Sequence, residues 1–404
     1  MRITWVTGHY PPDVGAASNR CADFTRIWAN LGHEVTVIAP PPVYHKETSE
    51  SNGLWKWEQD GKIRVLRAFK PASDYLFINR AVSEAAYAAM VAASTFRMTR
   101  QDVVIASSPP FPAAFAAFFL ARLKGARFVF DVRDLYPESA EAVGAIKSDL
   151  IIAMLRYLEG WIYRRAYLIA GTSQAYEEHV KKSGGKDVAF EYIPNGVWPP
   201  VRNPPKHGGE LFRKKVSAGG CFLVVYVGNV GYAHGLDVVL RAAKKTGGNV
   251  LFAVVGDGPR RAEIEDLAPD NVVFVSKKPR RDLGEVFAGA DLVLATQESD
   301  AAFKKVLLRK VLDGWAEGKA VVASAAGETA HVIEESGGGI ATSPQDASAL
   351  AKSILRLKAN PSLAREMGRR GRLYVKEHHN TEKLAKKYLQ LLIKGPRKRM
   401  RLGL

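Results

Sequence analysis

The stretch HYPPDVGAASNR, residues 9–20, lies between the two segments that decide how the chain begins to fold. Before it, RITWV (2–6) has the continuous apolar character of a buried strand. After it, CADFTRIWANLGHEVTVIAP (21–40) predicts a helix, a glycine that ends the helix, and a second strand. This order predicts a βαβ unit whose loop lies at a helix N-terminus, where a phosphate group is readily held.

The same alternation of apolar runs and helical patterns continues along the chain. Many runs are apolar throughout, which is typical of parallel sheets covered on both faces. In the first half, strands are predicted at 2–6, 34–40, 62–69, 102–108, 127–132, 167–173 and 189–196, and helices at 17–31, 80–98, 112–124 and 149–166. In the second half, strands are predicted at 221–229, 249–258, 271–276, 291–297, 319–325 and 337–342, and helices at 235–246, 259–268, 280–289, 346–358 and 361–393.

A stretch rich in proline and glycine separates the two halves, so we predict an α/β protein of two doubly wound, Rossmann-like domains facing a cleft. Ligands of such sheets bind at the carboxyl ends of the strands. The predicted parts are an N-terminal domain over 1–198, a linker over 199–220, a C-terminal domain over 221–378, a helix over 379–394 that packs back across both domains, and a basic tail over 395–404.

The chain of 404 residues carries a formal net charge of +17, which implies attraction to an acidic partner. Part of this charge lies in the tail KGPRKRMRLGL (394–404), a candidate for binding an anionic membrane surface. Residues 75–100, which mix aromatic side chains with basic ends, are a second candidate. We expect no secretory signal and no transmembrane helix, and a cytoplasmic protein, peripheral on the inner face of the cell membrane.

Two loops after strands are built for close approach to a ligand. In the first, Gly15 follows a pair of prolines and precedes two alanines, without the G-x-G-x-x-G pattern of dinucleotide sites. In the second, VYVGNVGYAHG (225–235), Gly228, Gly231 and Gly235 surround a strand-to-helix junction, and Asn229 lies between the first two. Free N–H groups at such a junction are suited to a diphosphate.

Two polar clusters supply candidate chemical groups. DVRDLYPES (131–139) places Asp131, Arg133 and Asp134 where a strand ends, and we predict that Asp134 or Asp131 orients or deprotonates a hydroxyl group. The basic segment from residue 301 to 328 offers cations for phosphate and a carboxylate for ribose hydroxyls. Its candidate phosphate-binding residues are Lys305, Arg309 and Lys310, and its candidate ribose-binding residue is Asp313.

With these loops in order, the chain resembles the retaining glycosyltransferases of family 4, which have the GT-B fold. The resemblance covers nearly the whole length. It is carried by HYPPDVGAASNR, DVRDLYPES, PNGV, VGNVG, VVGDGP and DGWAEGKAVVASAAGE followed by GGGI. DVRDLYPES with GNVG is similar to the branch that includes fucosamine transferases and other builders of bacterial surface polysaccharide.

The resemblance implies transfer of a sugar from a nucleotide donor, which we expect to be a UDP sugar, to a hydroxyl group of a lipid-linked or polysaccharide acceptor. It also implies that the N-terminal domain is the acceptor side and that no metal or other cofactor is needed. Nucleic acid is not expected as a partner, because no recognised nucleic-acid-binding module accompanies the charge. The chain departs from many relatives, because Asn229 and His234 stand where they carry Arg and Lys. Lys305 and Asp313 stand where they carry two glutamates.

Alternative functions explain fewer of these features. A dehydrogenase would need the dinucleotide glycine pattern. A UDP-sugar 2-epimerase shares the fold and the donor but needs no acceptor side. A basic nucleic-acid-binding protein would explain the charge but not the two phosphate-type loops.

Overall fold

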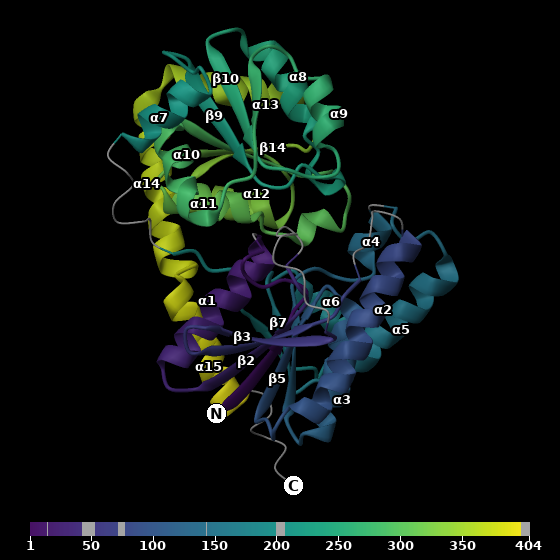
Figure 1. Cartoon of the computed structure of the whole chain (residues 1–404). Coiled ribbons are helices and arrows are strands. Elements are labelled where there is room, and N and C mark those ends of the chain that lie inside the picture. The colour runs from purple at the N-terminus through teal and green to yellow at the C-terminus, as the bar shows by residue number, and fades with distance from the viewer. Residues whose placement is uncertain (14, 43–52, 72–76, 143, 199–206, 397–404) are drawn as a thin grey trace. The chain divides into compact units, whose positions relative to one another are not determined.

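The computed structural model consists of two compact units, Met1–Gly196 with the segment from Thr381 onward, and Val197–Asn380 (Figure 1). Both are α/β units with parallel sheets, as predicted. The predicted tail over 395–404 falls mostly outside the described residues, as does the first part of the predicted linker. The described residues are 1–13, 15–42, 53–71, 77–142, 144–198 and 207–396.

The first unit has an eight-stranded sheet in the order β3-β4-β2-β1-β5-β6-β7-β8. Its strands are β1 (Arg2–Val6), β2 (Glu34–Ala39), β3 (Trp55–Asp60), β4 (Ile63–Ala68), β5 (Val103–Ser108), β6 (Arg127–Val132), β7 (Leu168–Gly171) and β8 (Phe190–Tyr192). Its helices are α1 (Ala16–Asn30), α2 (Phe77–Ala93), η2 (Ser94–Arg97), α3 (Phe111–Leu123), α4 (Glu138–Ala142), α5 (Asp149–Arg165), α6 (Tyr176–Gly184) and α15 (Thr381–Lys394).

The predicted parallel strands of this unit are confirmed, and one strand was missed. β3 pairs antiparallel with β4 at the edge of the sheet, across a turn at Gly61 with φ +58°. Its sequence, WKWEQD, is only partly buried along its length. A search for continuous apolar runs therefore passes over it, because an edge strand needs no such run.

The second unit has a six-stranded parallel sheet in the order β11-β10-β9-β12-β13-β14. Its strands are β9 (Phe222–Val227), β10 (Val250–Val255), β11 (Val272–Val275), β12 (Leu292–Thr296), β13 (Val321–Ser324) and β14 (Gly339–Thr342). Its helices are α7 (Gly208–Lys215), η3 (Tyr232–His234), α8 (Asp237–Thr246), α9 (Arg261–Asp266), η4 (Arg280–Asp282), α10 (Leu283–Gly289), η5 (Phe303–Lys305), α11 (Arg309–Ala316), α12 (Glu328–Ser336), α13 (Ala347–Ala359) and α14 (Pro361–His378).

The predicted linker over 199–220 is wrong in its second part. Residues 208–215 form α7, whose Phe212 is 2% exposed within the core of the second unit. A Cβ atom on Gly209 would lie 2.8 Å from the backbone of Ala288, and one on Gly289 would lie 2.8 Å from the Gly209 carbonyl oxygen. Glycine on both helices lets α7 and α10 touch through their backbones, so this segment is part of the second domain.

The helix predicted over 361–393 is interrupted at His379 and Asn380. At this interruption the Val197 N–H donates to the His379 carbonyl oxygen at 2.8 Å, and Val197 pairs with Asn380 in an isolated parallel β-bridge. α14 packs in the second unit, whereas α15 packs against α1 in the first, where Trp28 Nε1 donates to the Ala385 carbonyl oxygen at 2.8 Å. The chain therefore returns to the first unit between Asn380 and Thr381, within the predicted range 379–394.

Candidate functional site

The loop after β9, residues 228–235, is held tightly against the end of β10. The Gly228 N–H donates to the Val255 carbonyl oxygen at 3.0 Å, and Gly228 has φ +155°. A Cβ atom on Gly256 would lie 1.8 Å from the Gly228 carbonyl oxygen, and one on Gly258 would lie 2.4 Å from that of Val230. Both glycines belong to VVGDGP, whose structural role is to let this loop approach. We name residues 228–235 the β9 loop.

Lys310 lies directly beside the β9 loop. Its ammonium group donates to the Tyr226 hydroxyl at 2.8 Å, and that hydroxyl donates to the Asn229 carbonyl oxygen at 2.7 Å. A Cβ atom on Gly228 would lie 3.7 Å from Lys310 Nζ. The structure therefore brings together the predicted residues Gly228, Asn229 and Lys310. Gly231 joins them, since its Cβ position lies 2.8 Å from the Asn229 side-chain amide.

Lys310 is a buried cation without a carboxylate partner among the described residues. It is 7% exposed, and desolvation lowers its pKa to about 7. An anion placed beside it would restore its charge, because an opposite charge favours the ionised form. Burial and the charge of Lys310 together lower the pKa of His234 to about 3, so this imidazole is neutral at physiological pH. Of Lys310 and His234, Lys310 is therefore the side chain that can carry a positive charge beside the β9 loop near neutral pH.

The other predicted residues of the basic segment are arranged differently. Arg309 Nε donates to the Asp313 carboxylate at 3.2 Å, so these two side chains form an ion pair on α11. Arg309 Nη1 is buried without a hydrogen-bond partner in the described part of the chain. Lys305 is half-buried on η5, in the segment that follows β12. Tyr226, which orients Lys310, was missed because it belongs to an apolar strand and carries no signal of its own.

In the first unit, Asp131 is enclosed in a buried ion pair with Arg20. It is 0% exposed and accepts hydrogen bonds from Arg20 Nη2 at 2.7 Å, from Arg20 Nε at 3.1 Å and from the Ser107 hydroxyl at 3.3 Å. Arg20 also donates to the Pro194 carbonyl oxygen at 2.9 Å. This pair ties α1 to the ends of β6 and β8. Asp131 thus has its charge neutralised within the protein, which argues against direct contact with a substrate.

Asp134 and Arg133 lie just beyond the end of β6 and are half-buried. Burial raises the pKa of Asp134, and the charge of Arg133 opposes this change. Burial also lowers the pKa of Arg133. Arg133 Nε has no hydrogen-bond partner within the described residues. Of the predicted catalytic trio, these two residues therefore keep polar groups that a ligand could engage.

Gly15 begins α1 as its N-cap residue, with an extended backbone at φ 161°. No described atom lies within 4 Å of the position that its Cβ would occupy. The fold itself therefore does not require glycine here, and the space at this helix N-terminus is open. This is the property expected of a residue that lets a ligand approach the backbone.

A cluster of three potential metal ligands lies elsewhere in the first unit. One ligand atom each of Glu138, Glu159 and His179 lies within 4.8 Å of the others. Glu159 accepts hydrogen bonds from Tyr163 at 2.6 Å and pairs with His179 at 2.9 Å, and Glu138 pairs with Arg156. These contacts describe an ion-pair network within the helical layer, and we assign it a structural role.

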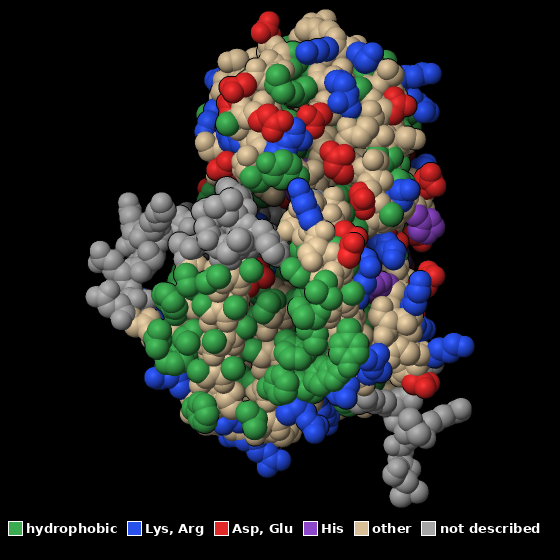
Figure 2. Space-filling view, turned by 90° about the vertical axis from the view of Figure 1, so that its right-hand side faces the viewer, with side chains coloured by type: hydrophobic (Ala, Val, Ile, Leu, Met, Phe, Trp, Pro, Cys, Tyr) green, Lys and Arg blue, Asp and Glu red, His purple; other side chains and the backbone are tan. Residues whose placement is uncertain are grey.

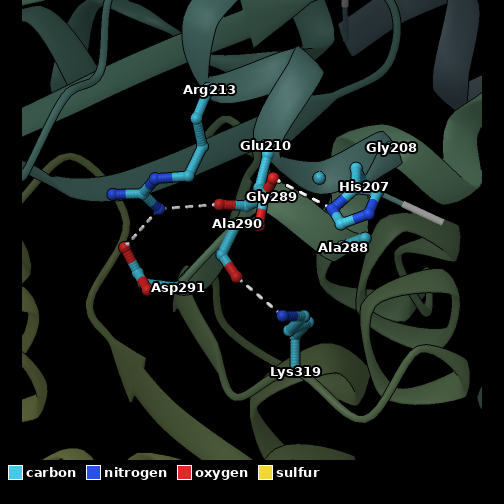
Figure 3. A pocket seen from close by; sticks show the side chains of 10 residues that line it. His207, Gly208, Glu210, Arg213, Ala288, Gly289, Ala290, Asp291 and Lys319 are labelled. Carbon is cyan, nitrogen blue, oxygen red and sulfur yellow. Dashed lines mark hydrogen bonds and ion pairs between the residues drawn. The ribbon is translucent and has the colours of Figure 1, made fainter.

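A hollow of about 480 Å³ in the second unit is lined by residues of α7, the end of α10 and the segments just before β12 and β13 (Figure 3). Its polar groups already bind one another: Arg213 donates to Gly289 and pairs with Asp291, and Lys319 donates to the Ala290 carbonyl oxygen at 2.7 Å. Asp291 and Lys319 lie just before β12 and β13, at the amino ends of those strands. The hollow is therefore at the opposite edge of the sheet from the β9 loop.

Two family models match the chain in succession. The model described as a glycosyl transferase 4-like domain matches residues 15–196, and the model described as glycosyl transferases group 1 matches residues 209–374. The boundary between the two matches agrees with the boundary between the two compact units.

One curated relative and several solved structures match over nearly the whole chain. The putative colanic acid biosynthesis glycosyl transferase WcaI of Escherichia coli is 23% identical, over 92% of this chain and 96% of that protein. Sucrose-phosphate synthase from Thermosynechococcus elongatus has a TM-score of 0.77 at 19% identity, over 97% of this chain and 98% of that one. Anabaena HepE in complex with UDP and glucose has a TM-score of 0.76 at 17% identity, over 97% and 99%. The two-unit architecture is thus the GT-B fold.

Proposed function

Because the chain is a glycosyltransferase built from a glycosyl transferase 4-like domain and a glycosyl transferases group 1 domain, we propose that it transfers a sugar from a UDP donor to a surface glycan of bacteria. A UDP donor is supported by HepE, whose solved structure contains UDP and glucose. A surface glycan is supported by the relative WcaI, described as acting in colanic acid biosynthesis. We further propose that the acceptor is a hydroxyl group of a lipid-linked or polysaccharide chain.

The observation that carries the proposal is the buried Lys310 beside the β9 loop. A lysine that is 7% exposed and has a pKa near 7 is costly to charge, and no carboxylate of the described residues compensates that cost. A diphosphate at the β9 loop would supply the missing negative charge. Lys310 would then stabilise the charge that develops on the leaving UDP as the sugar departs.

We propose that the sugar keeps its anomeric configuration. The acceptor oxygen attacks the anomeric carbon from the face on which the phosphate departs. The bond from that carbon to the phosphate oxygen breaks, the bond to the acceptor oxygen forms, and the hydroxyl proton passes to the phosphate. This route needs no enzyme nucleophile, and it agrees with an Asp131 already enclosed by Arg20. Asp134 would orient the acceptor hydroxyl, with Arg133 Nε as a second polar contact.

We also propose that the reaction needs no divalent metal, because Lys310 places a cation where the diphosphate charge would lie. Chelation with EDTA during turnover tests this point. We expect an unchanged transfer rate, and a rate restored only by added Mg²⁺ or Mn²⁺ would show that a metal carries the charge.

The donor proposal is tested by thermal-shift titrations with UDP, GDP and dTDP sugars, because a ligand that binds only the folded state raises its stability. We expect the largest shift with a UDP sugar. NMR analysis of the product would report its anomeric configuration, and an inverted product would overturn the retaining mechanism. Equal, flat responses to all three nucleotides would overturn the donor assignment.

A further inference from the structure

Three neighbouring helices of the first unit carry large apolar residues on their outer as well as their inner faces, with Arg156 on α5 as a charged exception that pairs with Glu138 and Glu141. α2, α3 and α5 bury one side against the sheet, where Tyr87, Phe118 and Ile162 belong to a common core cluster. A surface helix normally carries polar residues on the opposite side. These three helices instead carry exposed apolar residues on the side that faces away from the sheet. We name this combined outer surface the apolar face.

On α2 the outward stripe begins with Val82, which is 61% exposed. It continues through exposed alanines at 85, 89 and 92, and it ends at Phe96 on η2, which is 92% exposed. The spacing of these positions alternates between three and four residues, as a single helical face requires.

α3 and α5 extend the same surface. On α3, Phe119 is 46% and Leu123 is 73% exposed. On α5, Leu150 is 80%, Met154 is 53% and Tyr157 is 66% exposed. The half-buried ring of Trp161 joins the two helices, with its centroid 5.1 Å from that of Phe118. Figure 2 shows hydrophobic side chains covering the first unit broadly on this side, far more than the scattered apolar residues of an ordinary surface.

Basic side chains border the apolar face at one edge. Helices of a parallel sheet run opposite to its strands, so the C-terminal ends of η2, α3 and α5 lie at the same edge. Each end carries two cations: Arg97 and Arg100, Arg122 and Lys124, Arg164 and Arg165. The guanidinium carbon of Arg165 lies 4.1 Å from the ring centroid of Trp161. The exposed charged group of Arg165 thus lies over the face of an aromatic ring.

We propose that the apolar face docks on the surface of an anionic lipid bilayer, with the three helices lying in the interface and the basic edge contacting acidic headgroups. A broad apolar surface beside clustered Arg and Lys has the chemistry of such a partner. The net charge of +17 adds to the attraction. None of the described helices is long and apolar enough to cross a bilayer, so the contact is made from one side.

The docking face is independent of the donor chemistry, although under the proposed function it would bring a lipid-linked acceptor to the enzyme. The part of this face from Val82 to Phe96 falls within the segment 75–100 that the sequence singled out. The contributions of α3 and α5 come from the tertiary structure alone.

The test compares two triple variants of the full chain in vesicle co-sedimentation. F96S/L123S/L150S removes three strongly exposed residues of the apolar face, whereas L211S/L267S/L373S removes three leucines that are 53–59% exposed in the second unit. With vesicles of phosphatidylcholine and phosphatidylglycerol, we expect the first variant to bind at least tenfold more weakly than wild type and the second to bind like wild type. Removing the phosphatidylglycerol should weaken wild-type binding.

Equal binding by the two variants would overturn the proposal, and so would equal wild-type binding to neutral and anionic vesicles. Sedimentation without lipid addresses a competing occupant: a wild-type dimer that F96S/L123S/L150S converts to monomer would assign the face to a second copy of this chain. The thermal shift with UDP should be the same in all three proteins. A lost vesicle interaction with an intact UDP shift thus separates this inference from the donor proposal.

Discussion

Replacing Lys310 by methionine should stabilise the protein and weaken its binding of UDP at the same time. Lowering the pKa of Lys310 from 10.5 to about 7 corresponds to about 5 kcal/mol, the cost of charging this side chain in the folded state. Methionine has a similar length and carries no charge. It would lose the hydrogen bond to Tyr226, which at about 1.5–3 kcal/mol offsets part of the gain.

The net effect at pH 6 is an increase of about 2 kcal/mol in the free energy of unfolding. The pH dependence has a definite sign. Below pH 7, Lys310 is protonated in both the folded and the unfolded states, so the wild type bears the full cost. Between pH 7 and 10.5 the folded state has lost the proton that the unfolded state still holds, so wild-type stability rises with pH. The advantage of Lys310→Met should therefore shrink as the pH is raised from 6 to 9.

Urea unfolding at pH 6 and pH 9 measures the stability, and isothermal titration calorimetry with UDP measures the affinity. We expect UDP to bind roughly 10–100-fold more weakly to Lys310→Met, as the loss of one charged hydrogen bond predicts. Lys352→Met, at an exposed lysine of α13, is the matched control and should change neither quantity. Wild-type UDP affinity in Lys310→Met would refute the assignment of Lys310 to the diphosphate.

Three further predictions concern Lys310, Gly15 and Asp134. The affinity of the wild type for UDP should fall as the pH rises from 6 to 9, because Lys310 loses its proton near pH 7; calorimetry at a series of pH values checks this, and a flat profile would contradict it. Gly15→Ala should keep the wild-type thermal midpoint, since no described atom crowds its Cβ position, but should slow sugar transfer; a lowered midpoint would mean that Gly15 is structural. Asp134→Asn should lower kcat for transfer with little change in the UDP thermal shift, whereas loss of the shift would place Asp134 at the donor.

Much of the architecture was predictable because parallel sheets require strands that are apolar on both faces. The runs around Trp5, Val104 and Val254 show this pattern, and each became a central strand. β3 was missed because it lies at the edge of the sheet and is less buried than the central strands, so its sequence lacks a continuous apolar run. α7 was taken for a linker because the prolines before it dominate the local composition, whereas Phe212 and Gly209 decide its place through contacts with α10.

Among the site residues, the sequence could identify the types of group but not their partners. Asp131 and Asp134 look equivalent in DVRDLYPES, yet only Asp131 meets Arg20, which lies 111 residues away in the chain. Likewise Arg309 and Lys310 are adjacent in the sequence, but their side chains leave the helix in different directions. Arg309 contacts Asp313, whereas Lys310 contacts Tyr226. The contacts of Asp131 with Arg20 and of Lys310 with Tyr226 join segments 111 and 84 residues apart, which a local sequence pattern does not encode.

The sequence by itself determined the two Rossmann-like halves, the loops at their strand ends and the resemblance to family 4, because these depend on the periodicity and order of nearby residues. The tertiary structure decided which cation beside the β9 loop has no carboxylate partner within the described residues, which carboxylate is neutralised, and how three helices combine their outward stripes into one apolar face. Those properties depend on burial and on contacts between residues far apart in the chain, and only the packed molecule supplies them.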